Sequence, residues 1–201
     1  MPASRDPALD LRRRLRDARR GVSAGERLAA ADAVAGGLLA LPFAPTQGYV
    51  AGYWAVDGEV PLHAWQLRLP PQCVYCLPVL NEGGLDEGDN TLRFAPFRAG
   101  DETRPNRFGI PEPVLEATSL LQVTDMALIV LPLTGFDAKG HRLGMGGGWY
   151  DRTLRDHRTA PPYLVGVGFD RQRVEALQPR EWDVPCDAIV TESTTYLREK
   201  A

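Results

Sequence analysis

A continuous apolar segment at residues 126–131, Met-Ala-Leu-Ile-Val-Leu, constrains the fold of this chain more than any other feature. Six apolar residues without polar alternation are typical of a strand buried on both faces, as in the centre of a parallel sheet. Parallel strands are joined by crossover connections, which are usually helices. The segment therefore predicts an α/β fold with this strand inside the sheet.

The rest of the sequence alternates between strand and helix patterns, which favours a largely parallel sheet. Strands are predicted at residues 48–54, 73–77, 91–97, 163–169 and 188–191. Helices are predicted at residues 6–20, 62–69 and 149–157. Another helix is predicted to begin at the capping box of Ser23 and Glu26 and to end at Pro42. The proline-rich residues 100–114 are predicted to form a loop. We expect one domain over residues 1–201, with a helical segment at 1–42 and an α/β core at 46–195.

Length and composition exclude several classes of protein. With 201 residues, 44% of them hydrophobic and 24% charged, the chain is of globular type rather than disordered or fibrous. Its three cysteines (Cys73, Cys76 and Cys186) are too few for a disulfide framework, which favours a reducing compartment. The sequence shows neither an apolar signal segment nor an apolar run of the roughly 20 residues that a membrane span needs. We therefore expect a cytoplasmic protein without a membrane partner.

Positive charge is concentrated near the N-terminus. Residues 1–30 contain eight arginines and four acidic residues, whereas the whole chain has a net charge of −3. An arginine-rich helix can follow the phosphates of a nucleic acid, which gives one hypothesis for the function. The acidic remainder of the chain, and the lack of aromatic residues among the arginines, argue against a nucleic-acid partner.

A glycine-rich loop follows the apolar segment and precedes a predicted helix. Residues 144–148 are Gly-Met-Gly-Gly-Gly, and Arg142 and Arg152 flank them. Glycines allow a phosphate to approach backbone N–H groups closely, and a helix N-terminus favours negative charge. The loop lacks the Gly-Lys-Ser/Thr ending of a Walker motif and the spacing of a dinucleotide-binding motif. It indicates a phosphate site for a nucleotide, and the alternative is a turn that lets a helix pack closely on a strand.

The same loop carries a family resemblance. Residues 142–151, with Leu-Thr-Gly-Phe-Asp at residues 133–137, resemble the signature of 5-formyltetrahydrofolate cyclo-ligases, also called methenyltetrahydrofolate synthetases. Further blocks resemble that family in the same order, at residues 53–60, 106–113, 166–172, 182–187 and 190–192. The resemblance covers nearly the whole chain and implies a three-layer α/β/α fold with a mostly parallel central sheet.

The resemblance implies an enzyme that uses ATP and Mg²⁺ to convert 5-formyltetrahydrofolate to 5,10-methenyltetrahydrofolate. The N5-formyl group is an amide, and its oxygen is a poor leaving group. Transfer of a phosphoryl group from ATP to that oxygen would let N10 attack and phosphate depart. Such a transfer requires positioning and charge neutralisation from the protein rather than a nucleophile. The alternative is a relative that binds nucleotide or folate without turnover.

The resemblance also assigns roles to individual residues. The ATP site would comprise Arg12, Arg142, Gly144, Gly146, Gly147, Gly148, Trp149 and Tyr150. The folate site would comprise Glu59, Phe108, Trp149 and Tyr150, with Arg142 and Tyr150 as catalytic residues. Asp151 and Asp187 would bind Mg²⁺, because carboxylate oxygens suit a hard cation beside phosphates.

The first helix departs from the family pattern at one position. The family has a basic residue four positions before Arg12, where this chain has Ala8, so Arg13 or Arg16 would have to replace it. The other arginines of this helix are expected to form a solvated face. We expect a monomer whose partners are small-molecule substrates.

Overall fold

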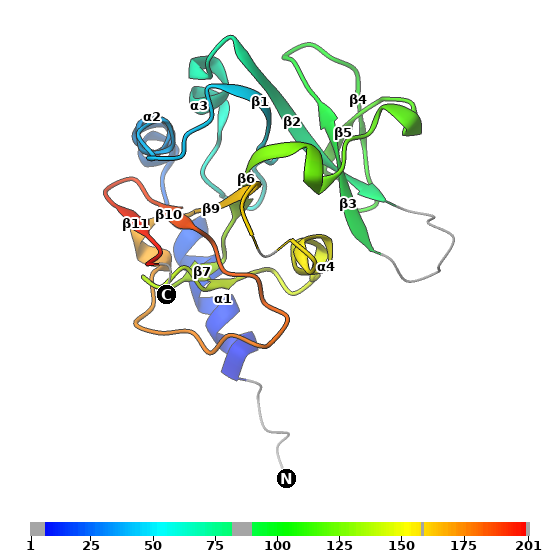
Figure 1. The fold of residues 1–201 in the computed structure, drawn as a ribbon. Coiled ribbons are helices and arrows are strands. Elements are labelled where there is room, and N and C mark those ends of the chain that lie inside the picture. The colour runs from blue at the N-terminus through cyan, green and yellow to red at the C-terminus, as the bar shows by residue number, and fades with distance from the viewer. Residues whose placement is uncertain (1–6, 82–89, 158, 200–201) are drawn as a thin grey trace.

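The computed structural model describes residues 7–81, 90–157 and 159–199, and it contains one large sheet with helices around it (Figure 1). The helices are α1 (Pro7–Arg20), α2 (Ala24–Leu39), α3 (His63–Arg68) and α4 (Trp149–Leu154), with 3₁₀ turns η1 (Ala117–Ser119), η2 (Val123–Asp125) and η3 (Asp170–Gln172). The strands are β1 (Gln47–Ala51), β2 (Gln72–Asn81), β3 (Thr91–Pro96), β4 (Thr103–Pro105), β5 (Pro111–Pro113), β6 (Met126–Pro132), β7 (Gly135–Phe136), β8 (Arg142–Leu143), β9 (Tyr163–Val167), β10 (Ala188–Val190) and β11 (Thr195–Leu197). No helix within these ranges has both the length and the apolarity to cross a membrane.

The main sheet has seven strands in the order β11-β10-β9-β6-β1-β2-β3. Neighbouring strands from β10 to β2 run parallel, whereas the edge strands β3 and β11 pair antiparallel with β2 and β10. β6, which contains the apolar segment at residues 126–131, occupies the middle of the sheet. The predicted α/β fold with a mostly parallel sheet is confirmed.

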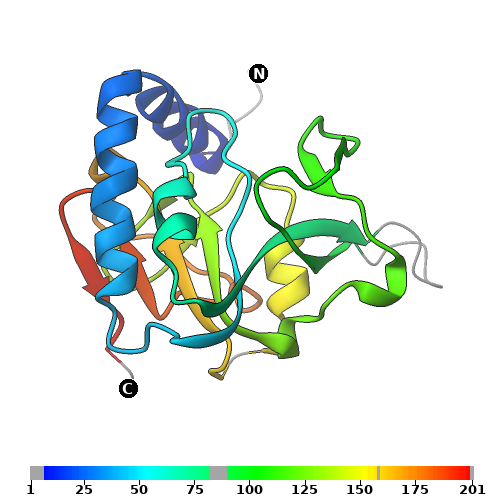
Figure 2. The same ribbon diagram turned by 90° about the horizontal axis from the view of Figure 1, so that it is seen from above.

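Different elements cover the two faces of this sheet. Leu128 and Val130 of β6 pack against α2 and α3 in one apolar cluster, whereas Ile129 and Leu131 pack in a second cluster with Leu154 of α4. This division follows from the alternation of side chains along a strand. In Figure 2, α2 runs beside α3, and α4 is set apart from both. The helices therefore form layers on opposite faces of the sheet.

Several predicted segments differ from the structure. The strands predicted at residues 48–54, 73–77 and 163–169 are β1 (Gln47–Ala51), β2 (Gln72–Asn81) and β9 (Tyr163–Val167). Residues 100–114 were predicted to form a loop, but β4 and β5 pair antiparallel within them. The prolines are tolerated because each strand of a two-stranded ribbon has one unpaired edge, where a missing N–H costs no hydrogen bond. α4 ends at Leu154 rather than at residue 157, and the chain turns there, with the N–H of His157 bonded to the carbonyl of Leu154.

The strand order reverses between β1 and β6. From β1 the chain crosses to β2 on one side, and from β6 it continues to β9 and β10 on the other side. Open parallel sheets bind ligands in the crevice at the carboxyl ends of such neighbouring strands. These ends continue into residues 52–60 after β1 and residues 133–148 after β6, which contain many of the predicted site residues.

Candidate active site

The glycine loop, residues 144–148, lies beyond the carboxyl end of β6. Pairing of β7 with β8 returns the chain to that end of the sheet, and the N–H of Thr134 donates to the carbonyl of Leu143 at 2.9 Å. Gly146 and Gly148 have positive φ angles of 101° and 67°, which glycine adopts without strain. A Cβ atom on Gly144 or Gly146 would meet nothing within 4 Å, so the loop is open to a ligand.

Arg142 and Asp151 form an ion pair beside this loop. Arg142 also donates to the carbonyl of Val184, and its side chain is almost fully enclosed. Asp151 lies in the first turn of α4. Burial raises the pKa of Asp151 and the nearby Asp183 raises it further, whereas Arg142 opposes the shift. The residue predicted to contact phosphate and one residue predicted to bind metal are therefore partners.

The two predicted metal ligands have different surroundings. Asp187 precedes β10 at the amino end of the parallel strands, and its Oδ2 accepts a hydrogen bond from the N–H of Leu164 at 2.9 Å. Asp183, which the sequence did not single out, is the acidic residue that interacts with Asp151. In the described part of the chain, no group of three or more His, Cys, Asp or Glu side chains could hold a metal ion. Asp183 lies in the family-like block at residues 182–187, which is the signal that could have found it.

Glu59 is a buried carboxylate in the segment that follows β1. Its Oε2 accepts a hydrogen bond from the N–H of Val56 at 3.0 Å, and its Oε1 accepts one from Arg19 Nη1 at 3.3 Å. Burial raises the pKa of Glu59 to about 7, although the hydrogen bond from the Val56 N–H and the charge of Arg19 oppose this shift. Tyr150 of α4 interacts electrostatically with both Glu59 and Arg142, and burial raises the pKa of its hydroxyl. Tyr150 is thus near both the carboxylate after β1 and the arginine after β6.

The prediction that the other arginines of α1 form a solvated face is wrong for Arg19. Arg12, Arg16 and Arg19 are spaced by four and three residues, which places them on one face of the helix. Arg16 Nε donates to Asp57 Oδ2 at 3.0 Å, and Arg19 is almost fully buried. The acidic side chains after β1 attract these guanidinium groups to the protein. The spacing was visible in the sequence, but the acidic partner was not.

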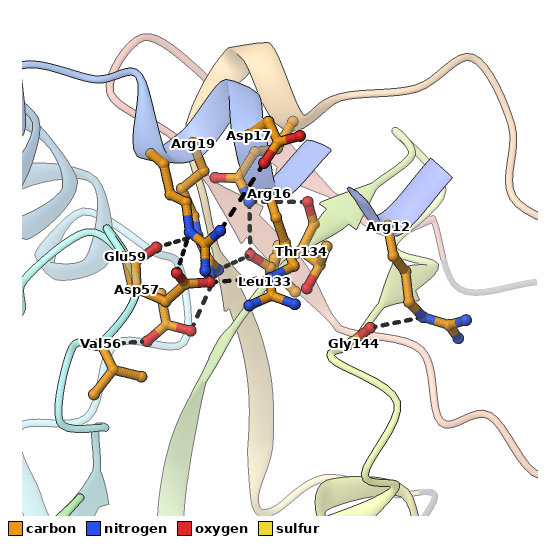
Figure 3. Close-up of polar contacts among 12 residues, drawn as sticks. Arg12, Arg16, Asp17, Arg19, Val56, Asp57, Glu59, Leu133, Thr134 and Gly144 are labelled. Atoms are coloured by element: carbon orange, nitrogen blue, oxygen red, sulfur yellow. Dashed lines mark hydrogen bonds and ion pairs between the residues drawn. The ribbon is translucent and has the colours of Figure 1, made fainter. Parts of the chain in front are cut away.

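Arg12 connects the same helix face to the glycine loop. Its Nε donates to the carbonyl of Gly144 at 3.1 Å, as Figure 3 shows. Arg13 is exposed, and the guanidinium of Arg16 is bonded to Asp57. Whether Arg13 or Arg16 replaces the basic residue missing at Ala8 stays a prediction.

An aromatic cluster borders the loop on its other side. Phe108, in the turn between β4 and β5, meets Trp149 edge to face, with 6.2 Å between ring centroids. The guanidinium of Arg107, which was not predicted, lies 5.0 Å and 5.2 Å from the centroids of these two rings. Phe108 is 57% exposed, so its ring is accessible to a flat ligand. The β4–β5 hairpin therefore brings a predicted folate residue to the start of α4.

The segment after β1 and the glycine loop after β6 thus meet at the carboxyl ends of the parallel strands. The glycine loop is open to an anion, and the segment after β1 encloses the carboxylate of Glu59. A pair of sites at the switch point of a parallel sheet is typical of α/β enzymes that bind a phosphorylated ligand beside a second substrate. The sequence model described as the 5-formyltetrahydrofolate cyclo-ligase family matches residues 6–192. The chain belongs to that family, as its motifs predicted.

Similarity to individual proteins supports this family membership. The 5-formyltetrahydrofolate cyclo-ligase of Escherichia coli K12 is 37% identical over 149 residues, which are 73% of this chain and 79% of that protein. The cyclo-ligase of Haemophilus influenzae is 37% identical over 138 residues, 68% of this chain and 71% of its own length. The NMR structure of Aquifex aeolicus 5,10-methenyltetrahydrofolate synthetase has a TM-score of 0.78 at 28% identity, and the match covers 96% of this chain and 94% of that one.

Proposed function

We propose that this chain uses ATP to convert 5-formyltetrahydrofolate to 5,10-methenyltetrahydrofolate, with release of ADP and phosphate. Family membership over residues 6–192 is the observation that carries the proposal. The protein would act in the cytoplasm as a monomer on small-molecule substrates, without nucleic acid.

The proposed reaction has two steps. The γ-phosphoryl group of ATP passes to the formyl oxygen, and the bond between the γ-phosphorus and the bridging oxygen of ADP breaks. N10 then attacks the formyl carbon and loses its proton, and the carbon–oxygen bond breaks as phosphate departs with that oxygen. Both steps need charge neutralisation and alignment, and neither needs a nucleophilic side chain.

The ATP site would lie at the glycine loop. The open backbone at Gly144 and Gly146 supports close approach of the phosphates, Gly147 and Gly148 continue the loop beside the Trp149 and Arg152 side chains, and α4 adds its first free N–H groups. Arg12 already reaches this loop, and Arg142 is placed beside it to neutralise charge that develops on the transferred group. Trp149 and Tyr150 would border the nucleotide where the loop enters α4.

The folate site would lie between the segment after β1 and the β4–β5 hairpin. Glu59 supports recognition of the amino and ring N–H groups of the pterin, because a carboxylate can accept hydrogen bonds from two neighbouring donors. Phe108 and Trp149 offer ring faces for the aromatic parts of folate. Tyr150 is protonated at neutral pH, and burial raises its pKa further, so its hydroxyl can donate a hydrogen bond to the formyl group.

Mg²⁺ would bind at Asp151, with Asp183 as the second carboxylate. Asp183 raises the pKa of Asp151, so a bound cation would stabilise the anionic form of Asp151, and Mg²⁺ commonly takes one or two protein carboxylates beside phosphates. When bound, the ion would neutralise phosphate charge. Asp187 stays a predicted ligand, although its carboxylate is bonded to the backbone at Leu164.

The appearance of methenyl absorbance after mixing protein, 5-formyltetrahydrofolate, ATP and Mg²⁺ tests this function. We expect product only when ATP is present, and one ADP for each product molecule. Absence of ATP-dependent product at any protein concentration would contradict the proposal and would favour a relative that binds without turnover.

A further inference from the structure

Arg19 of α1 is a buried, charged side chain that contacts both the segment after β1 and the end of β6. Its side chain is 1% exposed. Its Nε and Nη2 donate to the carbonyl oxygen and the carboxylate of Asp57, at 3.0 Å and 2.8 Å. Its Nη1 donates to Glu59 Oε1 at 3.3 Å and to the carbonyl of Leu133 at 3.1 Å. One guanidinium thus connects the segment after β1 to the end of β6 (Figure 3).

Asp57 fixes the orientation of this guanidinium. It adopts a left-handed φ of 52°, and its carboxylate also accepts hydrogen bonds from Arg16 and Arg20. Burial alone would raise the pKa of Asp57, but the bonds from the three arginines outweigh burial and lower it. Asp57 is therefore anionic at neutral pH and holds Arg19 from the side that faces solvent.

Two described groups favour a negative charge on Glu59, the N–H of Val56 and the guanidinium of Arg19, and of these Arg19 carries the positive charge. The side chain of Glu59 is 4% exposed, and the groups that face it are Arg19, the anionic Asp57, and the hydroxyls of Tyr53 and Tyr150, both with raised pKa values. Removing the cation from a buried ion pair leaves the remaining charge uncompensated. Arg19 is thus the cation, among the described side chains, that both bonds to Glu59 and lowers its pKa.

We propose that Arg19 is a positioning residue of the reaction, which favours the anionic form of Glu59 and aims its carboxylate at the folate while it anchors α1 at the end of β6. The same helix carries Arg12 to the glycine loop, so the anchor also supports the ATP side. The kinetic part of this inference rests on the proposed role of Glu59 in folate binding, whereas the ionisation of Glu59 can be measured without turnover.

The direct test is ¹³C NMR of protein labelled at the glutamate side-chain carboxyl carbon, with Glu59→Gln identifying the signal. We expect the wild-type signal to titrate with a pKa of about 7. Arg19→Met should move the midpoint upward by about one pH unit or more, and Arg19→Lys, which keeps the charge, should move it less. Arg14→Ala removes an exposed arginine of α1 and should leave it unchanged. An unchanged midpoint in Arg19→Met would overturn the proposal.

Kinetics supply the second test, with thermal unfolding as a check on folding. Arg19→Lys should raise the KM for 5-formyltetrahydrofolate by about tenfold and the KM for ATP much less. When Arg19→Lys is combined with Glu59→Gln, the folate KM should be no higher than in Glu59→Gln alone, because Arg19 acts through Glu59. Additive effects of the two substitutions, or equal changes for both substrates, would contradict the positioning role. A wild-type protein without turnover would instead refute the proposed function and leave the NMR result standing.

Discussion

Arg142 donates a hydrogen bond to Asp151, so a residue assigned to phosphate and a residue assigned to metal share one ion pair. Both also lie near Asp183 and the carbonyl of Val184. The pair joins the start of α4 to the strand that enters the glycine loop. A change in either residue is therefore expected to affect charge neutralisation on the transferred phosphoryl group.

Asp151→Ala should lower kcat by about 100-fold or more, because a carboxylate that supports the neutralising cation is removed. The fold should persist, since Asp151 is partly exposed and Arg142 keeps its hydrogen bond to the carbonyl of Val184. Steady-state kinetics over a range of Mg²⁺ concentrations would measure the effect. Asp156→Ala removes an exposed acid from the chain just after α4 and serves as the matched control. Near-normal turnover of Asp151→Ala at saturating Mg²⁺ would remove Asp151 from the metal site.

Arg12→Ala should raise the KM for ATP by about tenfold, because it removes a cation that reaches the glycine loop. The KM for 5-formyltetrahydrofolate should change little. Arg13→Ala, which removes a neighbouring exposed arginine, is the control for loss of charge from α1. If Arg13→Ala raised the ATP KM as much as Arg12→Ala, a general charge effect would explain the result better than a contact.

Two glycines of the loop should respond differently to alanine. Gly144 has room for a Cβ and lacks a positive φ, so Gly144→Ala should keep its unfolding temperature and raise the KM for ATP through contact with phosphate. Gly146 has equal room but a φ of 101°, so Gly146→Ala should also lose about 1–2 kcal/mol of stability. Thermal denaturation and ATP titration of both variants would separate backbone strain from phosphate approach. A Gly144→Ala enzyme with a normal ATP KM would argue against close contact at that position.

Glu59 should make stability fall as the pH rises. Its pKa is about 7 in the folded chain and 4.5 as an unperturbed group, so the folded state retains a proton that the unfolded chain has released. The free energy of unfolding therefore decreases across this interval. Glu59→Gln should lack this decrease, and urea titrations of both proteins between pH 5 and 8 would reveal it. Parallel stability curves would show that Glu59 titrates alike in the folded and unfolded states.

Local patterns predicted much of the fold. The uninterrupted apolar residues of β6 identified a central strand because burial on both faces leaves no place for a polar side chain. The capping box of Ser23 and Glu26 is present because its two hydrogen bonds form within four residues. The β4–β5 hairpin was missed because prolines argue against a strand, although a strand with one unpaired edge tolerates them.

The candidate site was harder to predict, because its contacts join distant parts of the chain. Arg19 meets Asp57 and Leu133 only after α1 folds across the carboxyl ends of β1 and β6. No periodicity within α1 indicates which acid will receive a guanidinium. Asp183 likewise approaches Asp151 only through the path of the chain between β9 and β10.

The most direct measurement follows the formyl oxygen. 5-Formyltetrahydrofolate labelled with ¹⁸O in the formyl group would be incubated with the protein, ATP and Mg²⁺, and the released phosphate would be analysed by mass spectrometry. We expect one labelled oxygen in phosphate for each methenyl product formed. Unlabelled phosphate, or no ATP-dependent product, would contradict it.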